Sequence, residues 1–136
     1  MSYFLLKTEP TVYSFDDLVR DGGTVWDGVT NNLALKNLRT AKVGDTCMIY
    51  HSGDEKAAVG IAKVSRAAYP DPKEKDEKLV VINIKAVGKF KKPVTLAELK
   101  NRRELKDFKL VRIPRLSVMP VPEDIWKLIV RLSKKE

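Results

Sequence analysis

Thr46-Cys47-Met48-Ile49-Tyr50-His51 and Ala57-Ala58-Val59-Gly60-Ile61-Ala62-Lys63-Val64 are two apolar runs on either side of the polar segment Ser52-Gly53-Asp54-Glu55. A further polar pair, Gly44-Asp45, precedes the first run. Short apolar runs bounded by glycine, serine and aspartate are typical of β-strands joined by a turn. The centre of this 136-residue chain therefore predicts a β-hairpin.

Further segments on both sides of the hairpin have the composition of strands. The longest runs from Leu79 to Val87 and is rich in valine and isoleucine. Between it and the hairpin, the stretch from Tyr69 to Lys78 contains two prolines and alternating charges, which predicts an exposed loop. Three shorter strands are expected at Tyr3–Lys7, Thr24–Trp26 and Arg115–Met119.

Helix-capping patterns lie between these strands. The stretches Ser14–Arg20 and Thr95–Lys100 each begin with a hydroxyl residue that is followed three positions later by an acidic residue, which is the spacing of a capping box. Another helix is expected to begin near Asn31 or Asn32 and to end by Thr40. The strands are therefore interrupted by short helices.

The C-terminal segment carries the clearest helical pattern. It begins near Pro122 and places apolar residues at helical spacing, namely Ile125, Leu128, Ile129 and Leu132. Together with the other elements, this pattern predicts one mixed α/β (α+β) domain over residues 1–136. We expect a small curved sheet or β-barrel of five or six strands, flanked by helices, with the C-terminal amphipathic helix packed on it.

The composition excludes several classes of protein. The single cysteine, Cys47, allows no internal disulfide and no multi-cysteine zinc site, and the single histidine, His51, allows no two-histidine metal site. No apolar run approaches the roughly 18 residues of a membrane span. We therefore expect a cytoplasmic protein with no membrane partner, no metal and no cofactor.

The positive charge is concentrated in one segment. The chain has a formal charge of +8, and the stretch from Lys85 to Arg115 alone has 11 basic and 3 acidic residues. Such a segment is typical of a surface that contacts phosphates, although basic runs are also found as solvated faces. The phosphate-contacting residues predicted here are Lys89, Lys91, Lys92, Arg102, Arg103 and Arg112.

Aromatic and polar residues lie near the expected strand ends. A planar base needs an aromatic face for stacking and fixed polar groups for its edge. Trp26 and Tyr50 could provide the face, and Asn31, Ser52 and Lys7 the polar groups. Both aromatic residues could equally belong to the core, and Asn31 could simply cap the following helix.

An enzymatic interpretation would begin with His51, the side chain that titrates near neutral pH. Ser52 follows it, but adjacent residues on one strand point to opposite faces and cannot act together as base and nucleophile. The chain has no Gly-x-Ser-x-Gly elbow and no glycine-rich phosphate loop. No catalytic residue is therefore assigned.

The order of short motifs along the chain resembles the EVE domain family. The motifs are Tyr3-Phe4-Leu5-Leu6-Lys7-Thr8-Glu9-Pro10, Tyr13-Ser14, Trp26-Asp27-Gly28-Val29, Tyr50-His51-Ser52, Ala68-Tyr69-Pro70-Asp71 and Arg115-Leu116-Ser117-Val118. The resemblance extends from about Ser2 to the C-terminal helix. It implies a PUA-like fold and a pocket for a flipped, modified base of a nucleic acid.

The resemblance also implies which residues form the site. The base pocket would consist of Lys7, Thr8, Glu9, Pro10, Trp26, Asp27, Asn31, Tyr50, His51, Ser52, Arg115 and Ser117, and Arg39 would join the phosphate-contacting set. This chain departs from the family at Thr30 and Leu35, where the family usually has arginine, and at Ala67, where it often has glutamate.

We therefore expect a non-catalytic module that binds DNA or RNA. Its base pocket would accept one extruded, modified base, such as a modified cytosine, while the segment from Lys85 to Arg115 contacts phosphates and sets the salt dependence. Two alternatives remain at this stage. One is an enzyme that processes RNA or nucleotides with His51 as general acid or base, and the other is an RNA-binding accessory that does not flip bases.

Overall fold

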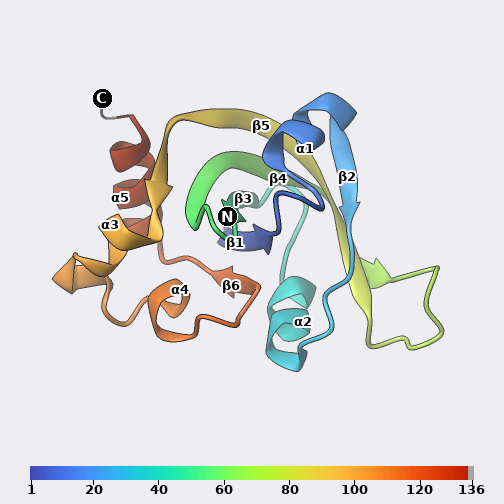
Figure 1. The fold of residues 1–136 in the computed structure, drawn as a ribbon. Helices are drawn as coiled ribbons and strands as arrows, with labels where there is room; N and C mark the ends of the chain where they lie inside the picture. The colour runs from blue at the N-terminus through green and yellow to red at the C-terminus, as the bar shows by residue number, and fades with distance from the viewer. Residues whose placement is uncertain (135–136) are drawn as a thin grey trace.

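A six-stranded mixed sheet dominates the computed structural model, which describes residues 1–134 (Figure 1). The strands lie in the order β2-β5-β4-β3-β1-β6. Their bounds are Tyr3–Thr8 for β1, Gly23–Trp26 for β2, Thr46–His51 for β3, Ala57–Pro70 for β4, Val80–Thr95 for β5 and Val118–Pro120 for β6. The predicted hairpin is confirmed as the antiparallel pair β3 and β4.

One strand pair is parallel. β1 runs alongside β3 in the same direction, with Lys7 opposite Tyr50 and Thr8 opposite His51, whereas the other pairs of neighbouring strands are antiparallel. A parallel pair needs a long crossover connection. The crossover here comprises residues 9–45 and contains two helices and strand β2.

The sheet curves because the long strands β4 and β5 change register along their length. Shifts occur between Ile49 and Tyr50 in the β3–β4 pair and at several places in the β4–β5 pair. Such bulges bend a strand and increase its twist. In Figure 1 the two strands sweep around the interior of the molecule, as expected for a small curved barrel-like sheet.

Strands β4 and β5 are both longer than the sequence predicts. β4 continues beyond Val64 to Pro70, and β5 continues beyond Val87 to Thr95. In the second half of β5 the side chains that face inward are mainly Phe90 and Val94, while the lysines between them are exposed. The start of the basic segment therefore belongs to a β-strand whose lysine side chains face solvent. The loop between β4 and β5 is shorter than predicted and comprises residues 71–79.

The described helices begin largely where the capping residues predict. Ser14 and Thr95 form complete capping boxes, and the Asn31 side chain accepts a hydrogen bond from the Ala34 N–H. Two short helices in the basic segment, η1 and α4, have no side-chain cap and were not expected from the sequence. The helices are α1 (Phe15–Asp21), α2 (Asn32–Arg39), α3 (Leu96–Lys100), η1 (Arg103–Leu105), α4 (Lys109–Arg112) and α5 (Glu123–Ser133).

The core lies inside the curve of the sheet and is closed by helices. Helix α1 packs on β5 and β2, α2 packs on β6, β5 and β4, and α5 packs on β5. On α5, the ring of Trp126 stacks on Tyr3 with 4.6 Å between centroids. Cys47 is fully buried, and burial raises the pKa of its thiol to about 12, so it behaves as a small apolar core residue. The expected mixed α/β class is confirmed.

None of the helices in the described part of the chain is both long enough and apolar enough to span a bilayer.

Phe15 joins helix α1 to the hairpin and gives a test of the packing. Its ring is fully buried, and a Cβ atom added to Gly60 of β4 would lie 2.5 Å from Phe15 Cζ. Gly60→Ala is therefore expected to lower the free energy of unfolding by about 1–3 kcal/mol, because the core has no room for the methyl group. Urea-induced unfolding followed by circular dichroism measures this change.

Gly88 of β5 provides the matched control. A Cβ atom there would have no other atom within 4 Å, so Gly88→Ala should leave the stability nearly unchanged. Equal stability of the two variants would contradict the close contact between β4 and α1.

Candidate functional site

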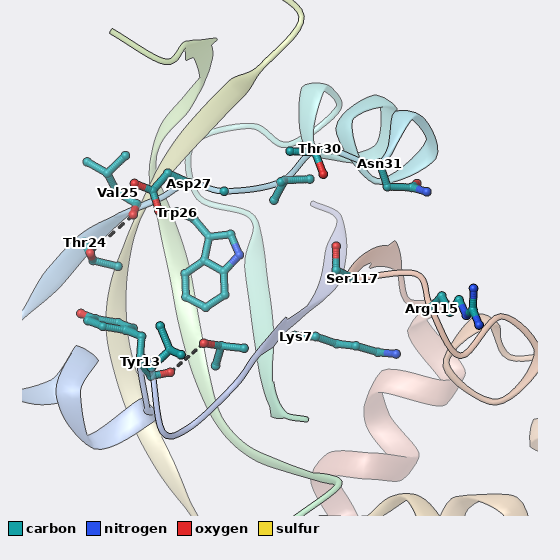
Figure 2. A pocket seen from close by; sticks show the side chains of 14 residues that line it. Lys7, Tyr13, Thr24, Val25, Trp26, Asp27, Thr30, Asn31, Arg115 and Ser117 are labelled. Carbon is teal, nitrogen blue, oxygen red and sulfur yellow. Dashed lines mark hydrogen bonds between the residues drawn. The ribbon is translucent and has the colours of Figure 1, made fainter. Parts of the chain in front are cut away.

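A cavity of about 520 Å³ opens where the crossover passes the ends of β1 and β2 (Figure 2). Its walls are the end of β1, the segment before α1, the segment from β2 to α2, and the loop before β6. The lining residues are Lys7, Thr8, Val12, Tyr13, Thr24, Val25, Trp26, Asp27, Gly28, Val29, Thr30, Asn31, Arg115 and Ser117.

Local backbone interactions hold these walls in place. The Lys7 N–H donates to the Ser117 carbonyl oxygen at 2.9 Å, which fixes the loop before β6 against β1. After β2 the chain turns at Gly28, whose φ of 77° is in the left-handed region. Asn31 then caps α2. The segment between β2 and α2 therefore forms a defined wall of the cavity.

Trp26 contributes the largest aromatic surface of the cavity. Its side chain is only 8% exposed, and Figure 2 shows the indole in the middle of the lining residues. Within residues 1–134 the indole N–H has no hydrogen-bond acceptor. It is also not fully buried, so a ligand can reach it. The ring edge therefore offers a free donor to the cavity.

Two cationic side chains, Lys7 and Arg115, line the side of the cavity that lies opposite Thr24 and Val25 in Figure 2. Lys7 Nζ donates to the Pro114 carbonyl oxygen at 2.6 Å and lies 5.6 Å from the centroid of the Tyr50 ring. Burial lowers the pKa of Lys7 from its usual value.

Arg115 is exposed, and the structure gives its guanidinium no acidic partner within residues 1–134. Lys7 contacts only a carbonyl oxygen and a ring, so its ammonium also has no acidic partner. Both cations therefore keep N–H groups that can donate to a ligand.

The polar groups of the lining are mostly donors. Asn31 uses its Oδ1 to cap α2, which leaves its amide N–H₂ for a ligand. The hydroxyl of Ser117 has no partner among the described residues, whereas Thr8 Oγ1 donates to the Tyr13 carbonyl oxygen at 2.7 Å. The cavity therefore favours a ligand edge with several acceptors.

The carboxylate of Asp27 is neutralised by a loop. Lys73 Nζ lies 2.9 Å from Asp27 Oδ2, and this hydrogen bond and the nearby charge raise the pKa of Lys73. At the other end of the same loop, Arg39 Nη2 donates to the Lys78 carbonyl oxygen at 2.7 Å. In this structure Arg39, predicted to contact phosphate, therefore fastens the loop of residues 71–79 to α2.

Several residues of the predicted base pocket lie outside the lining. Tyr50 is 3% exposed and lies beneath the Lys7 ammonium, so it supports Lys7 instead of presenting a free face; burial raises the pKa of its hydroxyl to about 12. Glu9 accepts hydrogen bonds from the N–H and hydroxyl of Thr11. The residues outside the lining are Glu9, Pro10, Tyr50, His51 and Ser52.

His51 has a structural position. Its Nε2 accepts a hydrogen bond from the Phe15 N–H at 2.9 Å, so the proton is on Nδ1, which donates to Glu55 Oε1 at 2.9 Å. The side chain is 10% exposed and bridges the end of β3 to the start of α1. Both ring nitrogens are engaged, which leaves neither for general acid or base chemistry.

The residues predicted to contact phosphate are spread over β5, α3–η1 and α4, and most are paired with nearby acids. Lys89 and Arg112 each lie 2.9 Å from an aspartate oxygen, and Arg102 lies 3.5 Å from Glu104. Lys91 and Arg103 are exposed. Of the whole segment from Lys85 to Arg115, only Arg115 lines the cavity. Lys92 Nζ lies 3.9 Å from Glu98 Oε2.

The sequence-based prediction did not include several lining residues. Tyr13 is one of them, and its hydroxyl donates to Asp21 Oδ2 at 2.9 Å. Part of the signal was present, because Tyr13 and the run from Trp26 to Val29 belong to the ordered motifs. The lining residues that were not predicted are Val12, Tyr13, Thr24, Val25, Gly28, Val29 and Thr30.

Comparison with known proteins places the chain among close relatives. The sequence model of the EVE domain matches residues 2–132. Human thymocyte nuclear protein 1 is 29% identical in an alignment of 169 positions, gaps included, that spans 99% of this chain and 75% of that protein.

Two solved structures are similar over nearly their whole length. Rpa0253 from Rhodopseudomonas palustris is 41% identical, with a TM-score of 0.92 over 98% of this chain and 93% of that one. The human THYN1 protein, in complex with 5-methylcytosine containing DNA, is 29% identical, with a TM-score of 0.92 over 100% and 99% of the two chains.

The two hydrogen bonds of His51 generate a prediction about stability. His51→Ala leaves the Phe15 N–H without an acceptor in a buried position, so the free energy of unfolding should fall by about 1–3 kcal/mol. Glu55→Ala removes only the half-exposed partner and should cost about 0–1 kcal/mol. Urea titrations of both variants and the wild type measure the difference. A His51→Ala variant as stable as the wild type would contradict the structural role.

Proposed function

The chain belongs to the EVE domain family, and from this membership we propose that it binds DNA and takes one extruded 5-methylcytosine into the cavity at Trp26. The observation that carries the proposal is the combination in one cavity of the Trp26 indole, two cations and unpaired donors. The similar human THYN1 structure, which contains 5-methylcytosine DNA, supports the choice of base.

The size and the aromatic content of the cavity suit a single base. Its volume of about 520 Å³ lies within the range of roughly 300–1,000 Å³ that is typical of small-molecule sites. Enzymes and readers that extrude a base hold it by contact with aromatic or apolar side chains and by hydrogen bonds to its edge. Trp26 and Tyr13 provide the aromatic contact in this proposal.

The donors of the cavity favour cytosine over adenine. The pairing edge of cytosine has two acceptors, O2 and N3, beside one amino donor, whereas that of adenine has one acceptor. Lys7 Nζ, the indole N–H of Trp26 and the amide of Asn31 can donate to such acceptors. The Ser117 hydroxyl can accept from the amino group.

The apolar part of the lining explains how a methyl group would be recognised. Val12 and Val29 contribute apolar surface to the lining, while Val25 points away from the indole in Figure 2. Burial of one methyl-sized group against such side chains contributes about 0.8 kcal/mol, or about a fourfold difference in affinity. We therefore expect a modest preference for the methylated base.

The two positions at which the family usually has arginine, Thr30 and Leu35, have different surroundings in this chain. Thr30 lines the cavity and presents a hydroxyl, while Leu35 is 2% exposed and belongs to the core. The positive charge that arginines would provide there is absent, so Lys7 and Arg115 carry the charge of the cavity.

Binding without a chemical reaction fits the side chains around the cavity. Residues 1–134 contain no group of three or more histidine, cysteine or carboxylate residues able to hold a metal ion. His51 lies outside the lining and uses both ring nitrogens in hydrogen bonds. The interpretation that His51 catalyses nucleic-acid processing therefore has no supporting geometry.

Base preference can be measured on a variant with one tryptophan. The chain has two tryptophans, and Trp126→Phe keeps an aromatic ring against Tyr3 while leaving Trp26 as the single reporter. Fluorescence titration should show about fourfold tighter binding to a DNA duplex with one 5-methylcytosine than to the unmodified duplex. An equal response to both duplexes, tighter binding to RNA of the same sequence, or cleavage of the oligonucleotide would contradict the proposal.

Replacement of Trp26 tests the site itself. Base–aromatic stacking contributes about 1–3 kcal/mol, so Trp26→Ala should weaken binding of the methylated duplex by about tenfold or more. Because Trp26 is largely buried, Lys7→Met serves as a second variant, and circular dichroism checks that both are folded. Fluorescence anisotropy with labelled DNA measures the affinity. Unchanged affinity in both folded variants would contradict a base site at this cavity.

A further inference from the structure

Three cations form a patch on the outer face of β4 and β5, away from the core. Lys63 and Arg66 on β4 and Lys85 on β5 are exposed, and we call these three residues the outer cationic patch. Lys63 and Lys85 are directly opposite each other in the antiparallel ladder. Like charges in this position disfavour each other, and none of the three has an acidic partner within residues 1–134. The patch therefore has uncompensated charge.

The guanidinium of Arg66 is held in a defined orientation. It lies 3.7 Å from the centroid of the Tyr69 ring, and the Tyr69 hydroxyl donates to Asn83 Oδ1 at 2.5 Å. A guanidinium that stacks on a ring keeps its N–H groups at the edge of its plane, where they can donate to an anion. The arginine is thus arranged for contact with an oxyanion.

A shallow hollow of about 300 Å³ lies between Lys85 of the patch and strand β2. Strand β2 is the edge of the sheet, and its residues Thr24 and Val25 line both the hollow and the cavity. Both spaces therefore adjoin the same strand. The lining of the hollow consists of Gly23, Thr24, Val25, Ser65, Asn83, Ile84 and Lys85.

The distance from the strand edge to the patch matches a short run of nucleotides. Neighbouring strands are about 4.8 Å apart, so Lys85 is one strand away from β2, and Lys63 and Arg66 are two strands away, at about 10 Å. A DNA strand advances about 3.4 Å per nucleotide. The patch itself extends over two neighbouring strands, about 4.8 Å, so it would face about two successive phosphates.

We propose that the outer cationic patch binds the phosphates of the DNA strand that flanks the extruded base, as the strand passes over the edge of β2. The inference rests on the proposed function of the cavity and adds a second contact surface to it. It also assigns the phosphate contacts to residues on β4 and β5, in place of the residues that the sequence predicts to contact phosphate. Lys85 lies at the start of the basic segment but is not one of those predicted residues.

Charge neutralisation of the patch provides the test. The variant Lys63→Gln/Arg66→Gln/Lys85→Gln should bind the 5-methylcytosine duplex about 10- to 100-fold more weakly, and the slope of log K against log salt should decrease by about 2–3. The ratio of affinities for methylated and unmethylated duplexes should remain as in the wild type, because phosphate contacts carry no information about the base. Anisotropy titrations at several salt concentrations measure all three quantities.

The control variant removes the same charge from the basic segment. Lys100→Gln/Arg103→Gln/Lys106→Gln changes three exposed cations at α3 and η1, which lie on the other side of the molecule from β2 in Figure 1. It should retain the affinity and the salt slope of the wild type. Thermal unfolding checks that both triple variants are folded.

The outcomes separate this inference from the proposed function. If the wild type prefers the methylated duplex but the patch variant retains the wild-type affinity and salt slope, phosphate binding by the patch is contradicted and base binding in the cavity is not. The patch is also wrong if the control variant loses as much affinity as the patch variant. If the wild type does not bind DNA, both proposals fail.

Discussion

The parallel pairing of β1 with β3 determines where the rest of the structure can lie. It places Lys7 opposite Tyr50 and Thr8 opposite His51, and it requires a crossover of residues 9–45. That crossover contains α1, β2 and α2, and with the end of β1 it forms most of the cavity wall. The His51 ring fastens the start of the crossover, because its Nε2 accepts the Phe15 N–H. The candidate site is therefore built from the connection that the parallel pair makes necessary.

Capping residues and apolar runs allow most elements to be predicted from the sequence, since these signals are local. Ser14, Asn31 and Thr95 begin helices as expected. The second half of β5 could not be predicted, because only Phe90 and Val94 mark its inward face among exposed lysines. The short helices η1 and α4 lack caps and depend on the tertiary structure around them.

The residues of the site were harder to predict than the elements, because a role depends on which face a side chain takes. Trp26 and Asn31 line the cavity, as the family resemblance implies. Tyr50 and His51, at the end of β3, lie outside the lining. Charge behaves in the same way. The excess in the segment from Lys85 to Arg115 is contiguous in sequence but spread over the surface and largely paired, for example through Arg112 and Asp107. Cations that lie together, such as those on β4 and β5, come from separate segments.

The carbonyl that holds Lys7 has a consequence for the energetics of ligand binding. Many buried ammonium groups are neutralised by a carboxylate, and a ligand must then displace that partner and leave it unpaired. Lys7 is positioned by the Pro114 oxygen and the Tyr50 ring, neither of which carries a net charge. An arriving acceptor can add to this arrangement without breaking an ion pair or reorganising the wall. The ammonium is therefore preorganised for an acceptor before a ligand binds. Holding it there costs the desolvation that lowers the pKa of Lys7.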